Sequence, residues 1–202
     1  MASDKVEAPA PLDVATLPPG QLARRRRIID VATRLLESTD YEQVQMRVVA
    51  DRADVALGTL YRYFVSKEQL YAAVLLEWSA SYAIDNSGPD DTAADRIRRR
   101  LHRALKAFER RPQFYKVQAM LQTTTDPRAE LLFAEFSARN HDTLVRDLRP
   151  LTGADADDRV MILNATLSSV LTSYAYRRLP MAEALRIINR AVDLVVGDIG
   201  VE

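Results

Sequence analysis

Apolar positions recur every three or four residues throughout the second half of the chain, and no strand-like alternation competes with this pattern beyond residue 90. Prolines and a glycine mark the ends of successive segments. The helices predicted in this way lie at about 92–110, 112–123, 126–149, 156–178 and 180–197. A further helix is expected from Lys67 to about Ile84, before the break at 86–89. The pattern therefore predicts an all-α fold.

Residues 45–64 predict two short helices joined by a tight turn. An apolar face at helical spacing defines the first helix: Met46, Val49, Ala50 and Ala53. Asp54 and Val55 follow as the turn, with Val55 as the apolar plug between the helices. In the second helix, Leu57, Leu60 and Phe64 are expected to point toward a core. Two such helices set steeply to one another expose the second, which suits the major groove of DNA.

The second helix leaves small and hydroxyl-bearing side chains facing out or partly out: Ala56, Gly58, Thr59, Tyr61 and Tyr63. Alanine and glycine let a backbone approach DNA closely, while hydroxyl groups suit phosphates or base edges. Ser66 is expected to cap the next helix, where its first amides and Lys67 would favour a phosphate. A plain structural corner would show the same periodicity, so the pattern alone leaves both interpretations open.

Residues 57–64, followed by Ser66, Lys67 and Leu70, resemble the recognition-helix signature of the TetR family of transcriptional regulators. Residues 46–55 are similar to the first helix and turn of that family, and the resemblance covers roughly residues 22–75. It implies a dimeric DNA-binding regulator. Two positions depart from the family pattern: Asp54 stands where a glycine is usual, and Gln45 where a threonine or serine usually caps the helix. Aspartate tolerates the left-handed turn conformation.

A closer resemblance links residues 41–64 to actinobacterial TetR-family repressors of cholesterol catabolism, with weaker similarity around 105–120 and 174–198. It implies a repressor that leaves a palindromic operator when a hydrophobic effector binds, such as a steroid-derived or fatty acyl-CoA. The alternative is an architectural or activating DNA-binding protein without a small-molecule effector.

Three regions follow from these patterns: a flexible arm over residues 1–20, a three-helix helix-turn-helix DNA-binding domain over 21–67, and an effector-binding and dimerisation domain over 68–202. Four arginines at 24–27 open the first helix, next to a buried stripe formed by Ile28, Ala32, Leu35 and Leu36. These arginines would contact the DNA backbone or minor groove, or form a solvated helix start. The residues expected to contact DNA are Arg24, Arg25, Arg26, Gln45, Arg47, Ala56, Leu57, Gly58, Thr59, Tyr61, Tyr63 and Lys67.

Composition excludes several other classes. The 202 residues include 28 basic and 28 acidic side chains, so the net charge does not indicate a nucleic-acid partner, although residues 21–67 carry a net charge of +3. The chain has no cysteine, and it shows neither an apolar stretch of membrane-spanning length nor a signal-peptide pattern. We therefore expect a cytoplasmic protein that does not bind membranes.

An enzyme is the competing class. His102 and His141 lack a metal-ligand spacing, and neither a nucleophile elbow nor a phosphate-binding glycine loop is present. We expect no catalysis, no metal and no cofactor.

Aromatic and flexible apolar residues of the middle helices, edged by a few polar groups, predict an effector pocket. The residues expected to line it are Trp78, Tyr82, Phe108, Phe114, Met120, Phe133, Phe136, Asn164, Leu167 and Tyr174. The last two helices are expected to pair about a two-fold axis in a homodimer. The residues expected at that interface are Leu163, Ser168, Leu171, Met181, Leu185, Ile188, Val192 and Val195.

One basic cluster stands out between residues 96 and 111, where eight lysines and arginines accompany a single acid, Glu109. A solvated helix face is the first interpretation. The alternative is that some of these arginines hold the phosphates of a coenzyme A ligand or approach the DNA backbone. On the same helix, Ile97, Leu101, Leu105 and Phe108 are expected to be buried.

Overall fold

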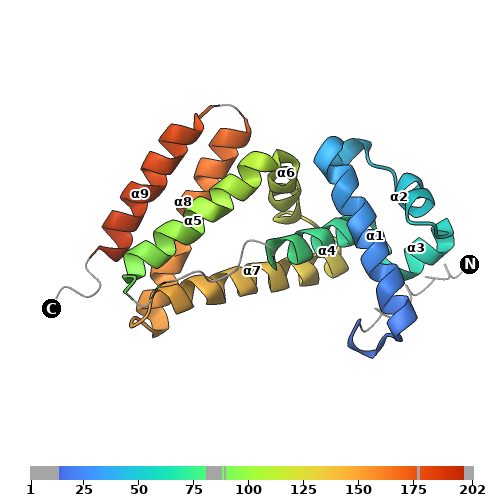
Figure 1. Cartoon of the computed structure of the whole chain (residues 1–202), viewed down its shortest axis with the longest axis horizontal. Helices are drawn as coiled ribbons and strands as arrows, with labels where there is room; N and C mark the ends of the chain where they lie inside the picture. The colour runs from blue at the N-terminus through green and yellow to red at the C-terminus, as the bar shows by residue number, and fades with distance from the viewer. Residues whose placement is uncertain (1–13, 81–87, 89, 177, 198–202) are drawn as a thin grey trace, which may run out of the picture.

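A computed structural model describes residues 14–80, 88, 90–176 and 178–197. All regular secondary structure within these ranges is helical, which confirms the predicted class. Figure 1 shows α1 to α3 at one end of the molecule, α5, α8 and α9 at the other, and α4 and α7 running between them. No helix in the described ranges is long and apolar enough to cross a membrane. The bounds are η1 Val14–Thr16, α1 Pro19–Ser38, η2 Tyr41–Gln43, α2 Met46–Arg52, α3 Leu57–Tyr63, α4 Lys67–Ala80, α5 Ala93–Arg110, α6 Pro112–Leu121, α7 Pro127–Asp147, α8 Gly153–Ala175 and α9 Met181–Val196.

Helix α1 begins earlier than the sequence predicts. Its first residue is Pro19, which suits the first turn because proline lacks an N–H that the helix would leave unpaired. The arginines at 24–27 therefore lie inside the helix, and the short helix η1 occupies part of the segment expected as a flexible arm; residues 1–13 of that arm lie outside the described ranges. The predicted stripe of α1 is buried, together with Ile29 and Val31.

The turn between α2 and α3 is closed by a Schellman motif. The Val55 N–H donates to the Ala50 carbonyl at 3.1 Å, and the Asp54 N–H donates to the Asp51 carbonyl at 3.2 Å. Asp54 takes the left-handed conformation, with φ of 52°, as expected from its place in the turn. Val55 is partly buried against the core, which confirms its predicted place between the helices.

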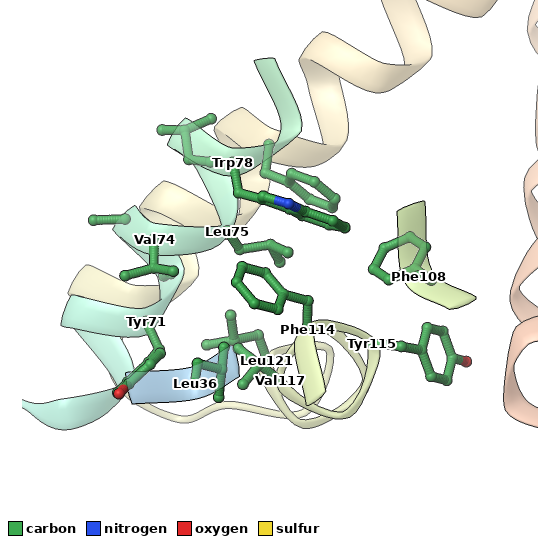
Figure 2. Packing of buried hydrophobic residues seen from close by; sticks show 14 of the residues in the cluster. Leu36, Tyr71, Val74, Leu75, Trp78, Phe108, Phe114, Tyr115, Val117 and Leu121 are labelled. Carbon is green, nitrogen blue, oxygen red and sulfur yellow. The ribbon is translucent and has the colours of Figure 1, made fainter. Parts of the chain in front are cut away.

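Helix α4 is the central apolar helix. Nine of its fourteen residues are buried, because α1, α6 and α7 all pack against it. Its described part ends at Ala80, so the predicted end near Ile84 lies outside the described ranges. Figure 2 shows Trp78 of α4 beside Phe108 and Phe114, with ring centroids at 5.0 and 4.5 Å. This aromatic cluster forms the core where α4, α5 and α6 meet.

Polar contacts join the end of α1 to α6. Lys116 of α6 lies 3.1 Å from Asp40, and Arg111 lies 2.8 Å from Glu37 at the end of α1. Hydrogen bonds from Lys116 and from Gln113 lower the pKa of Asp40. These contacts place the end of α1 directly against α6.

Replacing Asp54 by glycine should raise the free energy of unfolding by about 0.5–1 kcal/mol, because glycine enters the left-handed region without a Cβ clash. Asp54→Val should lower it, since a β-branched residue is poorly tolerated at positive φ. Urea unfolding followed by circular dichroism measures both changes. A valine variant as stable as the parent would contradict this account of the turn.

Candidate nucleic-acid interface and effector cavity

The outward face of α3 is formed by small and polar side chains. Ala56, the N-cap residue, and Gly58 are exposed, and Thr59 is partly buried. Tyr61 keeps 42% of its surface exposed, which is high for a tyrosine in a helix of only seven residues. The predicted outward orientation is confirmed for these four residues.

Gly58 is not required by the fold. No atom outside its neighbouring helix backbone lies within 4 Å of the position that a Cβ would take, and its φ is not positive. Glycine within a helix costs stability relative to alanine, because the unfolded chain is more flexible. Gly58 therefore leaves open space in front of the α3 backbone.

Tyr63 corrects the sequence analysis, which expected it to face out. Its side chain is only 9% exposed and belongs to the core, because residue 63 lies one turn after the buried Leu60 on the same face of α3. Leu57 is partly buried at the edge of that face, in agreement with its expected direction toward the core.

The arginines of α1 divide into two groups. Arg24 and Arg26 are exposed and are available to a phosphate backbone. Arg25 instead pairs with Glu77 at 3.1 Å and stacks over the Phe64 ring at 5.3 Å. It therefore helps to join α1 to α4, a role that the sequence analysis did not predict.

The starts of α2 and α4 complete the candidate interface. Gln45 and Arg47 are exposed, and Gln45 occupies the N-cap position of α2 without a side-chain capping bond. Ser66 accepts a hydrogen bond from the Gln69 N–H at 2.9 Å, which confirms its predicted capping role. The Lys67 ammonium lies over the Tyr41 ring at 4.2 Å and donates to the Glu42 carbonyl at 3.3 Å. Burial lowers the pKa of Lys67. Because the ammonium already contacts Tyr41 and Glu42, part of its expected phosphate-binding capacity is used inside the protein.

A cavity opens between the middle helices in two adjacent lobes of about 80 and 270 Å³. The smaller lobe reaches α5, and the larger lobe lies between α6, α7 and α8. Five residues border both lobes: Gln118, Phe136, Asn140, Asn164 and Leu167. The wall is mixed, with aromatic and aliphatic side chains interrupted by amides.

Five of the predicted pocket residues line this cavity: Phe108, Phe133, Phe136, Asn164 and Leu167. Trp78 and Phe114 do not line it, because they fill the aromatic core where α4 meets α6. Met120 and Tyr174 are partly buried but border neither lobe, and Tyr82 lies outside the described ranges.

Apart from Asn164, the polar residues of the cavity wall were missed by the sequence analysis. Arg100, Gln118, Asn140 and Thr143 all border it. The amide of Asn140 donates to the Phe136 carbonyl at 3.0 Å, which fixes its orientation. Isolated polar residues on amphipathic helices look like solvent-facing positions in a sequence, and only the packing of α5 to α8 turns these four inward.

Several members of the basic cluster on α5 have carboxylate partners within the chain, and one of them, Arg100, is buried, which the solvated-face interpretation did not predict. Arg100 is 9% exposed and forms an ion pair with Asp147, which is 3% exposed. Arg98 pairs with Asp193 of α9 at 2.7 Å. Arg99 binds both carboxylate oxygens of Asp91, at 2.7 and 2.8 Å.

Arg96 has a different role, because its side chain caps the C-terminal end of α7. Its guanidinium donates to the carbonyl of Asp147 at 2.9 Å and to that of Arg149 at 2.7 Å. A cation at the C-terminus of a helix satisfies carbonyls that have no partner within the helix. Lys106 and Arg110 remain as exposed members of the cluster.

The expected dimer residues also require correction. Leu163, Leu171, Ile188 and Val192 are buried within the single chain, where α8 and α9 pack on each other and on α5. The exposed apolar residues of these helices lie on the opposite face: Met161 and Leu194, each 69% exposed, and Ile162, 52% exposed. The other four expected interface residues are partly buried: Ser168, Met181, Leu185 and Val195. The exposed face of α9 also carries Arg186, Arg190 and Asp193. The helical period identifies the apolar face of each helix, but it does not specify whether that face packs within the chain or against a second copy.

A short exposed helix on a tight turn, carried by a larger helical body, is the arrangement of a helix-turn-helix regulator. Residues 28–74 match the model of the bacterial regulatory proteins of the tetR family. The chain belongs to the TetR family of transcriptional regulators, and its relatives are repressors rather than enzymes.

The similarity to individual proteins extends beyond the DNA-binding domain. The chain is 31% identical to the HTH-type transcriptional repressor KstR of Rhodococcus jostii, over 88% of this chain and 85% of that protein. It is 32% identical to KstR of Mycobacterium tuberculosis, over 88% and 83%. A TetR transcriptional regulator from Rhodococcus sp. RHA1 superposes with a TM-score of 0.76 and 25% identity, covering 89% of this chain and 98% of that one.

A more distant structure shares the fold. The transcriptional regulator FadR of Bacillus subtilis, solved in complex with stearoyl-CoA, has a TM-score of 0.65 and 19% identity, over 86% of this chain and 98% of that one.

Replacing Asp147 by asparagine should lower the free energy of unfolding by about 3 kcal/mol, because the Arg100 guanidinium would stay buried without its carboxylate. Asp142→Asn on the exposed side of α7 is the matched control and should change stability by less than about 0.5 kcal/mol. Chemical denaturation measures both. Equal stability of the two variants would show that the buried pair contributes nothing.

Proposed function

We propose that this protein is a repressor that binds a palindromic operator as a homodimer and leaves it when a hydrophobic effector occupies the cavity between α5 and α8. The observation that carries DNA binding is the exposed face of α3, with Gly58 at its centre and no structural need for glycine there. Arg24, Arg26 and Arg47 are exposed and would supply phosphate contacts beside it. The two KstR relatives named as repressors support the direction of regulation.

The exposed apolar face of α8 and α9 supports the homodimer. Met161, Ile162 and Leu194 are large apolar side chains that a single chain leaves in water, beside exposed charged residues such as Arg190 and Asp193. Pairing this face with its copy would place four helices around a two-fold axis. Two recognition helices would then face successive major grooves, which explains why the operator should be palindromic.

The cavity supports a hydrophobic effector with a polar group. Its lobes, of about 80 and 270 Å³, are small for an acyl-CoA or steroid, because ligand sites usually span roughly 300–1,000 Å³. Effector binding would therefore move the helices that line the cavity. The FadR complex with stearoyl-CoA is a precedent for an acyl-CoA in this fold.

The paired arginines of α5 argue against a phosphate clamp on that helix. Arg96, Arg98 and Arg99 are held by helix ends or carboxylates, and Arg100 is buried with Asp147. If the effector is a coenzyme A thioester, its apolar part would enter the cavity while its phosphates lie elsewhere. A free acid and its thioester should then compete for the same cavity.

Helix α7 supplies a route from the cavity to α3. Phe136 and Asn140 of α7 line both lobes, and the residue that caps α7, Asp126, accepts a hydrogen bond from Ser66 at the start of α4. A displaced α7 would thus move α4 and the recognition helix that precedes it. The effector must bind the DNA-free state more tightly than the DNA-bound state, because equal affinity would shift nothing.

Gly58→Ala should raise the free energy of unfolding by about 0.5 kcal/mol and yet weaken operator binding about tenfold, because the new methyl group would stand between α3 and the DNA. Gly20→Ala is the matched control: Gly20 is also the second residue of its helix and also faces open space. It should stabilise the protein without changing DNA affinity. Fluorescence anisotropy measures binding to a duplex that is selected from a random-sequence pool. The same titration gives the stoichiometry, which we expect to be two chains per duplex. Unchanged affinity of Gly58→Ala would refute the close approach.

Steroid and fatty acyl-CoA thioesters, each with its free acid, should raise the melting temperature and release the selected duplex. At a ligand concentration of 100 times Kd the stabilisation is about 2.7 kcal/mol. Leu167→Trp places a larger side chain at the border of both lobes and should impair release while leaving DNA binding intact. Ala138→Trp, on the exposed side of α7, is its control for the ligand response. DNA binding without any ligand response would favour a regulator that has no effector.

A further inference from the structure

The turn of the helix-turn-helix is held from outside by a side chain of α1. The Arg27 Nε donates to the Ala53 carbonyl at 2.8 Å, and its Nη2 lies 3.5 Å from the Asp54 carbonyl. Neither of these two carbonyls accepts a hydrogen bond of the Schellman motif, which uses the carbonyls of Ala50 and Asp51. A single guanidinium therefore bridges α1 and the segment that joins α2 to α3.

This contact falls where the backbone is under strain. Asp54 is the single non-glycine residue with positive φ in the described ranges, at 52°. Such a conformation persists where its surroundings hold it. The guanidinium also lies at the C-terminal end of α2, where the helix dipole favours a positive charge. Hydrogen bonds from a charged donor are about twice as strong as neutral ones, so this clamp is well suited to fix the turn.

We propose that Arg27 is a positioning residue, which sets the angle of the recognition helix and does not contact DNA phosphate. This inference rests on the proposed operator binding. The sequence groups Arg27 with Arg24, Arg25 and Arg26. Arg24, Arg26 and Arg27 are all exposed, but Arg27 differs because its Nε donates to a carbonyl of the turn.

Positioning and phosphate contact have different signatures. Base-edge contacts depend on the exact placement of α3, whereas contacts to the phosphate backbone carry no sequence information. Loss of the clamp should therefore weaken binding to the selected operator and leave binding to a scrambled duplex almost unchanged. Each phosphate contact adds about −0.9 to the slope of log K against log salt concentration, so a positioning residue leaves that slope unaltered.

The test compares Arg27→Ala, Arg27→Lys and the control Arg26→Ala on the selected and scrambled duplexes at several salt concentrations. Arg27→Ala should weaken operator binding about tenfold or more, change scrambled-duplex binding less than about twofold, and keep the salt slope. Arg27→Lys should recover part of the loss, because an ammonium restores the charge but not the two-pronged geometry. Arg26→Ala should weaken both duplexes alike and reduce the slope.

Three results would overturn the inference: unchanged operator binding by Arg27→Ala, equal loss on both duplexes, or a reduced salt slope. Thermal unfolding of each variant measures its folded fraction independently, and the affinities are corrected for this fraction before they are compared. If Arg27→Ala does not fold, Arg27→Lys and Arg27→Gln supply the same comparison. Failure of the parent protein to prefer any selected duplex would instead refute the proposed operator binding itself.

Discussion

The hydrogen bond between Ser66 and Asp126 joins the caps of α4 and α7, two helices that move together in the proposed mechanism. Ser66 accepts from the Gln69 N–H at the start of α4, and Asp126 accepts from the N–H groups of Arg128 and Ala129 at the start of α7. Burial raises the pKa of Asp126, but its hydrogen bonds outweigh this and lower the pKa overall, so the carboxylate stays ionised. Helix α4 follows α3 directly, and α7 lines the cavity. The relative placement of the two domains depends on these shared caps, together with the apolar packing of α4 on α7.

Charge is used in this protein mainly to hold helix ends and to join helices. Arg27 satisfies carbonyls at the end of α2, and Arg96 does the same for α7. Arg100 and Asp147 pair in the interior, where each charge needs the other. A net charge of zero is consistent with this use, because most arginines of α5 have carboxylate or carbonyl partners within the chain.

The sequence was most informative where the chemistry is local. The helical period, the turn at Asp54 and the cap at Ser66 depend on residues a few positions apart, and all three are found as predicted. It was least informative for the role of each charged or aromatic side chain. The partner of Arg98 lies 95 residues away, and that of Arg100 lies 47 residues away. No local pattern records such pairings, so α5 was interpreted as a solvated or phosphate-binding face.

The sequence by itself determined the class of protein: an all-α chain with a helix-turn-helix, a body of further helices, and the residues of the α3 face. It could do so because periodicity, turn chemistry and the family signature are properties of short segments. Only the tertiary structure decided which apolar residues line the cavity, which face of α8 and α9 stays exposed, and which arginines are free to meet DNA. Those distinctions depend on the neighbours that each side chain acquires when helices distant in the sequence pack together, and an amphipathic pattern does not specify those neighbours.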